Sequence, residues 1–227
     1  MSPDRDAPTR SPDGARWAPL ASALLCGLML IGLVAGLQRW TDGFERWTFE
    51  SRRQWQVAQG QLRAPAVALI GSDGAPLPAW AAEPAARAYL VDFIYTRCPS
   101  VCLALGTHYQ QMQRELQQGP DTAAGVRLLS VSIDRAHDQP PELARYAALH
   151  KADPHWWRLA APASDADATA LLRALGVVVV PDGLGGFNHN GAIHLIDGQG
   201  RLRALFDFEQ WPHALDAARA LAAEDAS

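Results

Sequence analysis

Two cysteines separated by three residues, Cys98 and Cys102, form the pattern with the most chemical potential in this sequence. They follow an apolar run from Tyr89 to Tyr95, which is typical of a buried strand. On a helix, residues i and i+4 lie about 40° apart around the axis, so both sulfur atoms face the same way. A helix N-terminus at this point also favours the thiolate form, which binds soft metals or attacks disulfides.

Three uses of this pair are open: a redox couple, two metal ligands, or a structural bridge. A structural bridge gains little, because closing so short a loop removes little chain entropy and Pro99 already stiffens it. Redox enzymes of the thioredoxin type place two residues between their cysteines, and a spacing of three makes a ligand role at least as natural. Two thiolates select Cu(I), or Zn(II) where two further ligands exist, so a third donor decides between these uses.

Among the seven histidines, His189 has the position best suited to a third donor. It follows the glycine-rich segment 183–186, expected to be a flexible loop, and immediately precedes a strand, so its ring can reach a site at other strand ends. His108 lies about 240° around and about 9 Å along the predicted helix from Cys102, which excludes it from the same metal. His194 is expected to be a core histidine within a strand. Solvated, capping or loop positions are expected for the others: His137, His150, His155 and His213.

Composition bounds the class of protein. The chain has 227 residues, 48% of them hydrophobic, and a net charge of −4, which fits one globular domain plus a membrane segment. No basic stripe is joined to aromatic residues, so nucleic acid is not an expected partner. Three cysteines are too few for a disulfide scaffold, and the eight tryptophans are scattered as expected for packing residues.

The N-terminal part of the sequence predicts a membrane anchor. Residues 1–17 have the composition of a disordered tail, and residues 18–37 are uncharged over the length that a helix needs to cross a bilayer. Cys26 is expected to be a small apolar residue of that helix, and the run is too long for a cleaved signal peptide. Residues 38–62 then form a juxtamembrane linker. Arginines flank the helix on both sides, so charge does not decide the orientation.

Residues 63–227 predict an α/β domain. Apolar runs and turn signals favour strands at 66–70, 88–95, 126–133, 192–196 and 202–206, and helices at 100–118, 141–150, 165–175 and 212–223. The last two strands flank Asp197-Gly198-Gln199-Gly200, a hairpin signature. This order suits a central mixed sheet with helices on both faces.

Three segments of the chain resemble the Sco/SenC family, membrane-anchored proteins with a thioredoxin-like fold that handle copper for cytochrome c oxidase assembly. The resemblance covers about residues 60–210. It is carried by the stretch from Asp92 to Cys102, by Ser130-Val131-Ser132-Ile133-Asp134 with Asp138, Pro140 and Glu142, and by Phe187-Asn188-His189 with residues 192–197 and Gly200.

The resemblance implies that Cys98, Cys102 and His189 are copper ligands, and that the two cysteines also form a redox-active disulfide. It implies a membrane-anchored chaperone, more a metallochaperone than an enzyme, that carries Cu(I) or Cu(II) to an apo copper-site subunit of cytochrome c oxidase or another acceptor. The domain is expected on the extracytoplasmic (periplasmic) side of the inner membrane, where oxidising chemistry is normal. Asp134 and Asp138 match acidic family positions, and a helix cap with solvated charge is the expected role.

This chain departs from the family pattern at two positions. Leu103 stands where a proline usually follows the second cysteine, and Asn188 stands where an acid often precedes the histidine. Leu103 is expected to change the helix entry rather than ligation, and Asn188 to shift copper affinity.

Two other functions use the same cysteines. A thiol-disulfide reductase that maintains the cysteines of a copper-site subunit would need Cys98 and Cys102 but not His189. A redox or copper sensor would act through a regulatory partner. Copper binding and disulfide reduction by cysteine and histidine variants separate these alternatives.

Overall fold

The computed structural model describes residues 14–40, 49–77, 80, 86–98, 101–119 and 125–224, with the backbone alone for 14–18, 49–50 and 101–104. The chain divides into two compact units, Met1–Arg52 and Arg53–Ser227. Most of the predicted N-terminal tail, residues 1–13, lies outside the described residues.

The first unit contains one long helix, α1 (Gly14–Trp40). Its segment Pro19–Trp40 has 22 residues with a mean hydropathy of 2.4, and none of its most apolar stretch is buried against protein. Cys26 is exposed on this helix. Length and composition therefore allow α1 to cross a bilayer, over a range that includes most of the predicted anchor.

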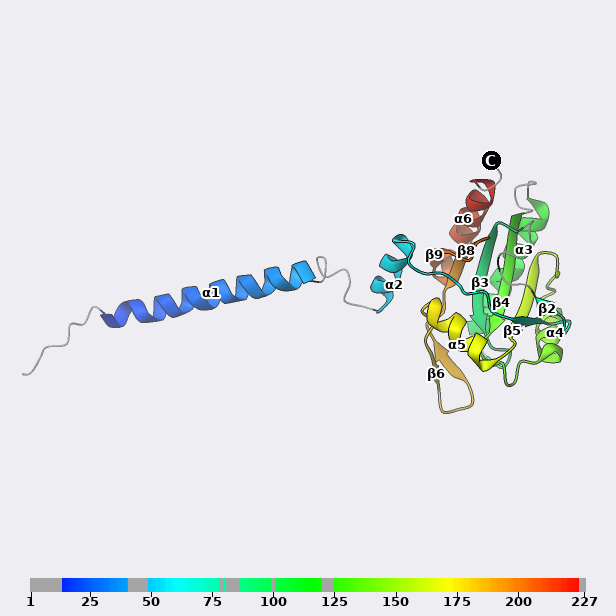
Figure 1. Ribbon diagram of the computed structural model, residues 1–227, viewed down its shortest axis with the longest axis horizontal. Coiled ribbons are helices and arrows are strands. Elements are labelled where there is room, and N and C mark those ends of the chain that lie inside the picture. The colour runs from blue at the N-terminus through cyan, green and yellow to red at the C-terminus, as the bar shows by residue number, and fades with distance from the viewer. Residues whose placement is uncertain are drawn as a thin grey trace, which may run out of the picture. The chain divides into compact units, whose positions relative to one another are not determined.

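The second unit is built on a mixed sheet of seven strands in the order β2-β1-β5-β4-β3-β8-β9 (Figure 1). The pairs β3–β4 and β4–β5 are parallel, whereas β8, β9, β1 and β2 join the sheet by antiparallel pairs. The predicted central mixed sheet is confirmed. The strands are β1 (Leu69–Gly71), β2 (Pro76–Leu77), β3 (Ala88–Ile94), β4 (Val126–Ser132), β5 (Trp157–Pro162), β8 (Ile193–Asp197) and β9 (Leu202–Phe206).

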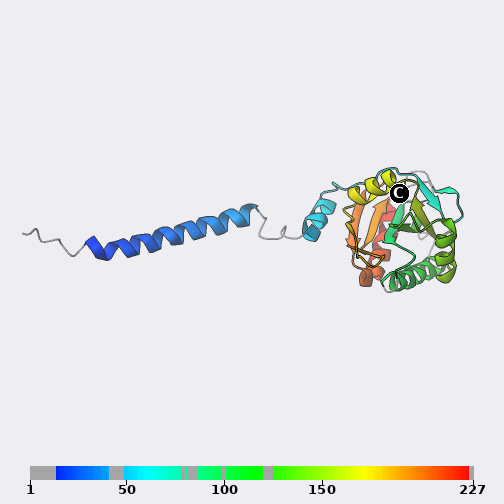
Figure 2. The ribbon, with the colours of Figure 1, turned by 90° about the horizontal axis from the view of Figure 1, so that it is seen from below.

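Helices cover both faces of this sheet, as Figure 2 shows for α5 and α3 on its opposite sides. One face packs against α3 (Val101–Gln118), α4 (Pro140–Leu149) and α6 (Trp211–Glu224), which follows the 3-10 turn η3 (Phe208–Gln210). The other face packs against α5 (Asp165–Ala174) and Val57 of α2 (Phe49–Ala58). Each face has its own buried apolar cluster, as expected for a three-layer α/β unit.

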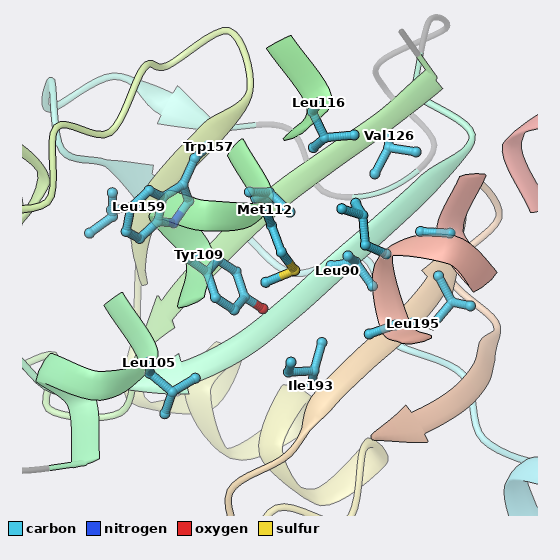
Figure 3. Close-up of a cluster of buried hydrophobic side chains, with 14 of the residues drawn as sticks. Leu90, Leu105, Tyr109, Met112, Leu116, Val126, Trp157, Leu159, Ile193 and Leu195 are labelled. Atoms are coloured by element: carbon cyan, nitrogen blue, oxygen red, sulfur yellow. The ribbon is translucent and has the colours of Figure 1, made fainter. Parts of the chain in front are cut away.

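Helix α3 is held on the sheet by one apolar stripe. Leu105, Tyr109, Met112 and Leu116 recur at intervals of three or four residues, which places them on one side of the helix. Figure 3 shows their side chains reaching β3, β4 and β5, where they meet residues such as Leu90 and Trp157. This packing fixes the helix whose first turn contains Cys102.

The first difference from the predicted elements is strand β5, which the sequence did not indicate. Its segment Trp157–Pro162 lies parallel beside β4, with all residues buried except the partly buried Arg158. Trp157 is 1% exposed and donates its indole N–H to Ser130 Oγ at 2.9 Å. The run is short and interrupted by an arginine, so its strand character comes from its neighbours in the sheet.

The predicted hairpin around residues 197–200 is confirmed. Strands β8 and β9 pair antiparallel, and Asp197 Oδ1 accepts hydrogen bonds from the N–H groups of Gln199 at 2.9 Å and Arg201 at 2.8 Å. Gly200 has a φ of +81°, a conformation that L side chains rarely adopt.

The segment around His189 also differs from its prediction. Instead of a flexible loop before a strand, β6 (Val179–Pro181) and β7 (Phe187–His189) form a separate two-stranded sheet, with Val179 opposite His189. His189 is therefore a strand residue, and its backbone is fixed by pairing.

Candidate metal centre

The first predicted ligand, Cys98, lies on a turn at the end of β3. Its N–H donates to the carbonyl oxygen of Tyr95 at 3.1 Å, and its half-buried side chain packs against the larger apolar cluster. Pro99 and Ser100 lie outside the described residues, and α3 begins at Val101. Cys102 is thus placed in the first turn of α3 by its backbone, as predicted.

A buried carboxylate, Asp138, holds this turn in place. Its Oδ2 accepts from the Thr96 N–H at 3.0 Å and from the Ser132 hydroxyl at 2.6 Å, and its Oδ1 accepts from the Thr96 hydroxyl at 2.6 Å. Asp138 is 0% exposed. Three donors to one buried carboxylate, two of them from Thr96, fix the residue two positions before Cys98.

A second carboxylate, Asp134, supports the same turn. Its Oδ2 accepts from Arg97 Nη2 at 2.6 Å, and its backbone N–H donates to Ser132 Oγ at 3.0 Å. The prediction of solvated helix-capping charges was wrong for both acids, because Asp134 is 7% exposed and both side chains face the turn rather than water. Their charge is compensated by hydrogen bonds that join β4 to the Cys98 turn.

The third predicted ligand, His189, is held by the β6–β7 hairpin. Within the connection between the two strands, Asp182 Oδ1 accepts from the N–H groups of Leu184 at 2.7 Å and Gly186 at 2.9 Å. These two bonds lower the pKa of Asp182. The glycine-rich segment is therefore a turn closed on a carboxylate.

Tyr95 connects the hairpin to the cysteine turn. Its hydroxyl donates to the carbonyl oxygen of Phe187 at 3.3 Å, and the two rings meet edge to face with centroids 5.4 Å apart. A Cβ added at Gly186 would lie 3.0 Å from the Tyr95 oxygen, so the backbone approaches this hydroxyl closely. Tyr95 lies three residues before Cys98, and Phe187 lies two residues before His189. This contact brings two segments far apart in the sequence to one region of the domain.

The His189 ring has properties that suit a metal ligand. It is half-buried, and among the residues that the structure describes no hydrogen-bond partner faces its buried Nδ1 atom. Burial lowers its pKa, which favours the neutral imidazole. A neutral imidazole with an unsatisfied ring nitrogen suits a metal ion or a bound proton donor.

The donor types fit copper. A cysteine thiolate is a soft ligand, and with imidazole it suits copper better than hard cations such as Mg²⁺ or Ca²⁺. The described part of the chain contains no cluster of three or more histidine, cysteine or acidic residues arranged to hold a metal. The side chain of Cys102, the remaining predicted ligand, lies outside the described residues.

A family comparison decides the class of protein. A model of the SCO1/SenC family matches residues 67–223. The chain belongs to the SCO1/SenC family. The resemblance seen in the three sequence segments is therefore confirmed, and with it the thioredoxin-like fold.

Individual relatives of the family agree with this assignment. The SCO1 protein homolog of Bacillus subtilis (strain 168) is 26% identical over 116 residues, which cover 50% of this chain and 58% of that protein. The copper-bound structure of ScoI from Bradyrhizobium japonicum has a TM-score of 0.56 at 22% identity, covering 69% of this chain and 99% of that one. BsSco, a Sco-family cytochrome c oxidase assembly protein in which a disulfide switch was identified, has a TM-score of 0.60 at 18% identity, covering 71% and 94%. At these identities the two structures support the fold.

Five histidines of this SCO1/SenC domain were predicted to be core, solvated, capping or loop residues, and all but one follow the prediction. His194 is a core residue with 0% exposure, as predicted. His150 was expected to be solvated, but it is 7% exposed, with its ring against Gly106 and Trp157. The sequence signal for its burial was Gly106, a glycine inside a helix, which leaves room for a ring. The other three histidines with predicted solvated, capping or loop positions are exposed: His137, His155 and His213.

Several residues that support the site were not singled out from the sequence. Tyr95 and Thr96 precede Cys98 directly and make its contacts to the hairpin and to Asp138. Their position between a buried strand and a reactive cysteine was the sequence signal that could have identified them as supporting residues. Asn188, where the family often has an acid, is exposed, and so the charge difference lies on the surface of the hairpin.

Proposed function

We propose that this protein is a membrane-tethered copper chaperone that binds copper through Cys98, Cys102 and His189 and delivers it during cytochrome c oxidase assembly. The observation that carries the proposal is the contact of Tyr95 with Phe187, which brings the hairpin of His189 against the turn of Cys98. Membership of the SCO1/SenC family and the copper-bound ScoI relative support the choice of copper.

Copper is the cargo of this site, and the protein residues provide its ligands. Two thiolates and one neutral imidazole satisfy Cu(I), and the imidazole also allows Cu(II) to bind. Release proceeds by ligand exchange, in which a thiolate or imidazole of the acceptor replaces one donor at a time. Disulfide formation between the cysteines, with two electrons and two protons passing to a partner disulfide, removes both thiolates and prevents loading.

The proposal includes an organisation along the chain. Residues 1–17 form a tail, 18–37 the anchor, 38–62 the juxtamembrane segment and 63–227 the copper-binding domain. The apolar α1 supports the anchor by its length and composition. The domain lies on the extracytoplasmic side of the inner membrane, where the thiol pair can alternate between reduced and oxidised forms.

Metal analysis of the full-length chain, purified reduced in detergent, tests the ligand set. Wild type is expected to retain one copper per chain, and Cys98→Ser, Cys102→Ser and His189→Ala to lose it. His213→Ala, at an exposed histidine on α6, is the matched control and should retain copper. Unchanged copper retention in His189→Ala would refute the ligand assignment.

The same variants separate the chaperone from a disulfide reductase. The disulfide switch of the relative BsSco makes thiol exchange the second function to test. Reductase activity that needs both cysteines and survives His189→Ala, in a protein that retains no copper, would favour the reductase.

A further inference from the structure

One arginine of the juxtamembrane helix α2 is buried in the domain. Arg53 is 2% exposed, although its neighbours Arg52 and Gln54 on the same helix are exposed. Burying a guanidinium group is strongly unfavourable unless hydrogen-bonding partners compensate its lost hydration. The contacts of the Arg53 side chain therefore show which segments of the domain α2 supports.

The Arg53 side chain contacts the end of α5. Its Nε donates to the carbonyl oxygen of Leu175 at 2.9 Å. The next residue, Gly176, has a φ of +65°, and a Cβ added there would lie 3.1 Å from Arg53 Nε. The guanidinium group thus rests on the backbone at the point where α5 ends.

The same short segment is bound by the residue that follows His189. Asn190 donates from Nδ2 to the carbonyl oxygen of Gly176 at 3.0 Å, and its Oδ1 accepts from the Val178 N–H at 2.6 Å. Val179, the next residue, pairs with His189 in the hairpin. Arg53 and Asn190 therefore hold neighbouring peptide groups at the C-terminal end of α5.

A second route joins Arg53 to the chain beyond His189. Its Nη2 donates to Nε2 of His194, a fully buried residue of β8. The His194 Nδ1 lies 3.0 Å from the carbonyl oxygen of Ala192, three residues after His189, and 3.2 Å from that of Val91. With Nε2 accepting from Arg53, Nδ1 carries the proton and donates to these carbonyls.

We propose that Arg53 is a positioning residue for His189, so that the juxtamembrane helix α2 is part of the scaffold of the copper site. It supports the histidine strand by two routes, through the Leu175–Gly176 backbone to which Asn190 is bound and through His194 of β8. This inference rests on the proposed function, because His189 must be a copper ligand for its position to affect copper.

Arg53→Met in the full-length chain tests the proposal, with Arg52→Met on the same helix as the matched control. Hydrogen exchange of the copper-free protein is expected to accelerate in the peptide covering residues 187–191 and to stay unchanged in β3. Copper retention against a competing chelator is expected to fall about tenfold or more, as for other residues that orient metal ligands. Arg52→Met should match wild type in both measurements.

Arg53→Lys provides a second variant that keeps the positive charge. A single ammonium group cannot reproduce the two-sided contact with Leu175 and His194, so the same direction of change is expected. In Cu(II)-loaded protein, both Arg53 variants should weaken the nitrogen hyperfine signal of His189 in electron paramagnetic resonance and keep the thiolate charge-transfer band.

The outcomes distinguish this inference from the proposed function. If His189→Ala loses copper while both Arg53 variants retain it with unchanged exchange, the positioning role is refuted. If His189→Ala retains copper, the ligand assignment fails. The hydrogen exchange of residues 187–191 in the Arg53 variants then decides by itself whether Arg53 positions the His189 strand. Uniform acceleration of exchange in β3 and β7, or failure of both variants to fold, would refute positioning in favour of a general structural role.

Discussion

Replacement of the buried Asp92 by asparagine should change how the stability of the domain depends on pH. Asp92 lies in the middle of β3 with 1% exposure, and among the described residues its Oδ1 has no hydrogen-bond partner. Burial raises its pKa from 3.8 to about 7, and the nearby hydroxyl groups of Ser130 and Tyr109 offset only part of this effect. The folded protein therefore keeps a proton that the unfolded chain releases.

The sign and size of the effect follow from this difference in pKa. Because the folded state binds the proton more tightly, the contribution of Asp92 to the free energy of unfolding is highest below pH 4 and falls as the pH rises toward 7. The slope is about 1.4 kcal/mol per pH unit, which gives about 4 kcal/mol over the interval between the two pKa values. The neutral Asp92→Asn side chain does not titrate, so the free energy of unfolding of the variant should rise by about 4 kcal/mol relative to wild type between pH 4 and pH 8.

Urea unfolding of the globular unit in the full-length chain, followed by tryptophan fluorescence at several pH values, measures this difference. Asp216→Asn is the matched control, because that side chain is 74% exposed on α6. His194 acts in the opposite direction: burial, followed by the charge of Arg53, lowers its pKa to about 3, so it removes stability as the pH falls from about 6.5. The variant must therefore be compared with wild type at each pH. A pH-independent difference between Asp92→Asn and wild type would refute the assignment of a neutral buried acid.

Three further substitutions test contacts around the site. Gly106→Ala would place a Cβ in steric conflict with the His150 ring, and urea unfolding should show a loss of about 1–3 kcal/mol in stability that His150→Ala partly restores. Asp138→Ala leaves three donors around the Cys98 turn without their acceptor and should lower the free energy of unfolding by about 3 kcal/mol or more in the same assay. Tyr95→Phe removes the hydroxyl that donates to the Phe187 carbonyl oxygen and keeps the ring, and should cost about 1 kcal/mol and accelerate hydrogen exchange in β7.

Each of these substitutions has an outcome that contradicts its reasoning. Wild-type stability of Gly106→Ala would mean that α3 and α4 do not approach as closely as the ring contact requires. Wild-type stability of Asp138→Ala would show that the hydrogen bonds accepted by this carboxylate do not hold the turn. Unchanged β7 exchange in Tyr95→Phe would show that the hydroxyl bond does not help to hold the hairpin.

The central part of the fold follows from local sequence patterns. The run that forms β3 is buried and apolar except for Asp92, so it is predicted without knowledge of its neighbours, and the β-branched and leucine residues of β4 mark that strand as well. The β8–β9 hairpin follows from Asp197 and the glycines of its turn, which act within a few residues. Such elements are predictable because their determinants lie inside the element.

The elements that the sequence did not reveal depend on contacts between distant residues. Strand β5 is defined by pairing with β4 and β1, and its own segment is short and mixed in character. The burial of His150 requires Gly106, 44 residues earlier on another helix. The hairpin of His189 is held by Asp182, Asn190 and Tyr95, none of which marks it as a strand when read alone.

The same distinction applies to the candidate site. The spacing of Cys98 and Cys102 is a local signal, and it predicts a pair of thiols at a strand-to-helix turn. His189 is linked to that turn only through long-range contacts, those of Tyr95 and, on our proposal, Arg53. An unpartnered buried ring nitrogen on His189 costs about 1–3 kcal/mol until it binds a partner. If His189 is the copper ligand that we propose, that cost weakens the copper-free state relative to the loaded one, and the contact of Tyr95 with the hairpin reduces the ordering needed on binding. On the proposed function, a site preorganised in this way retains copper with few ligands and still loses them one at a time to an acceptor.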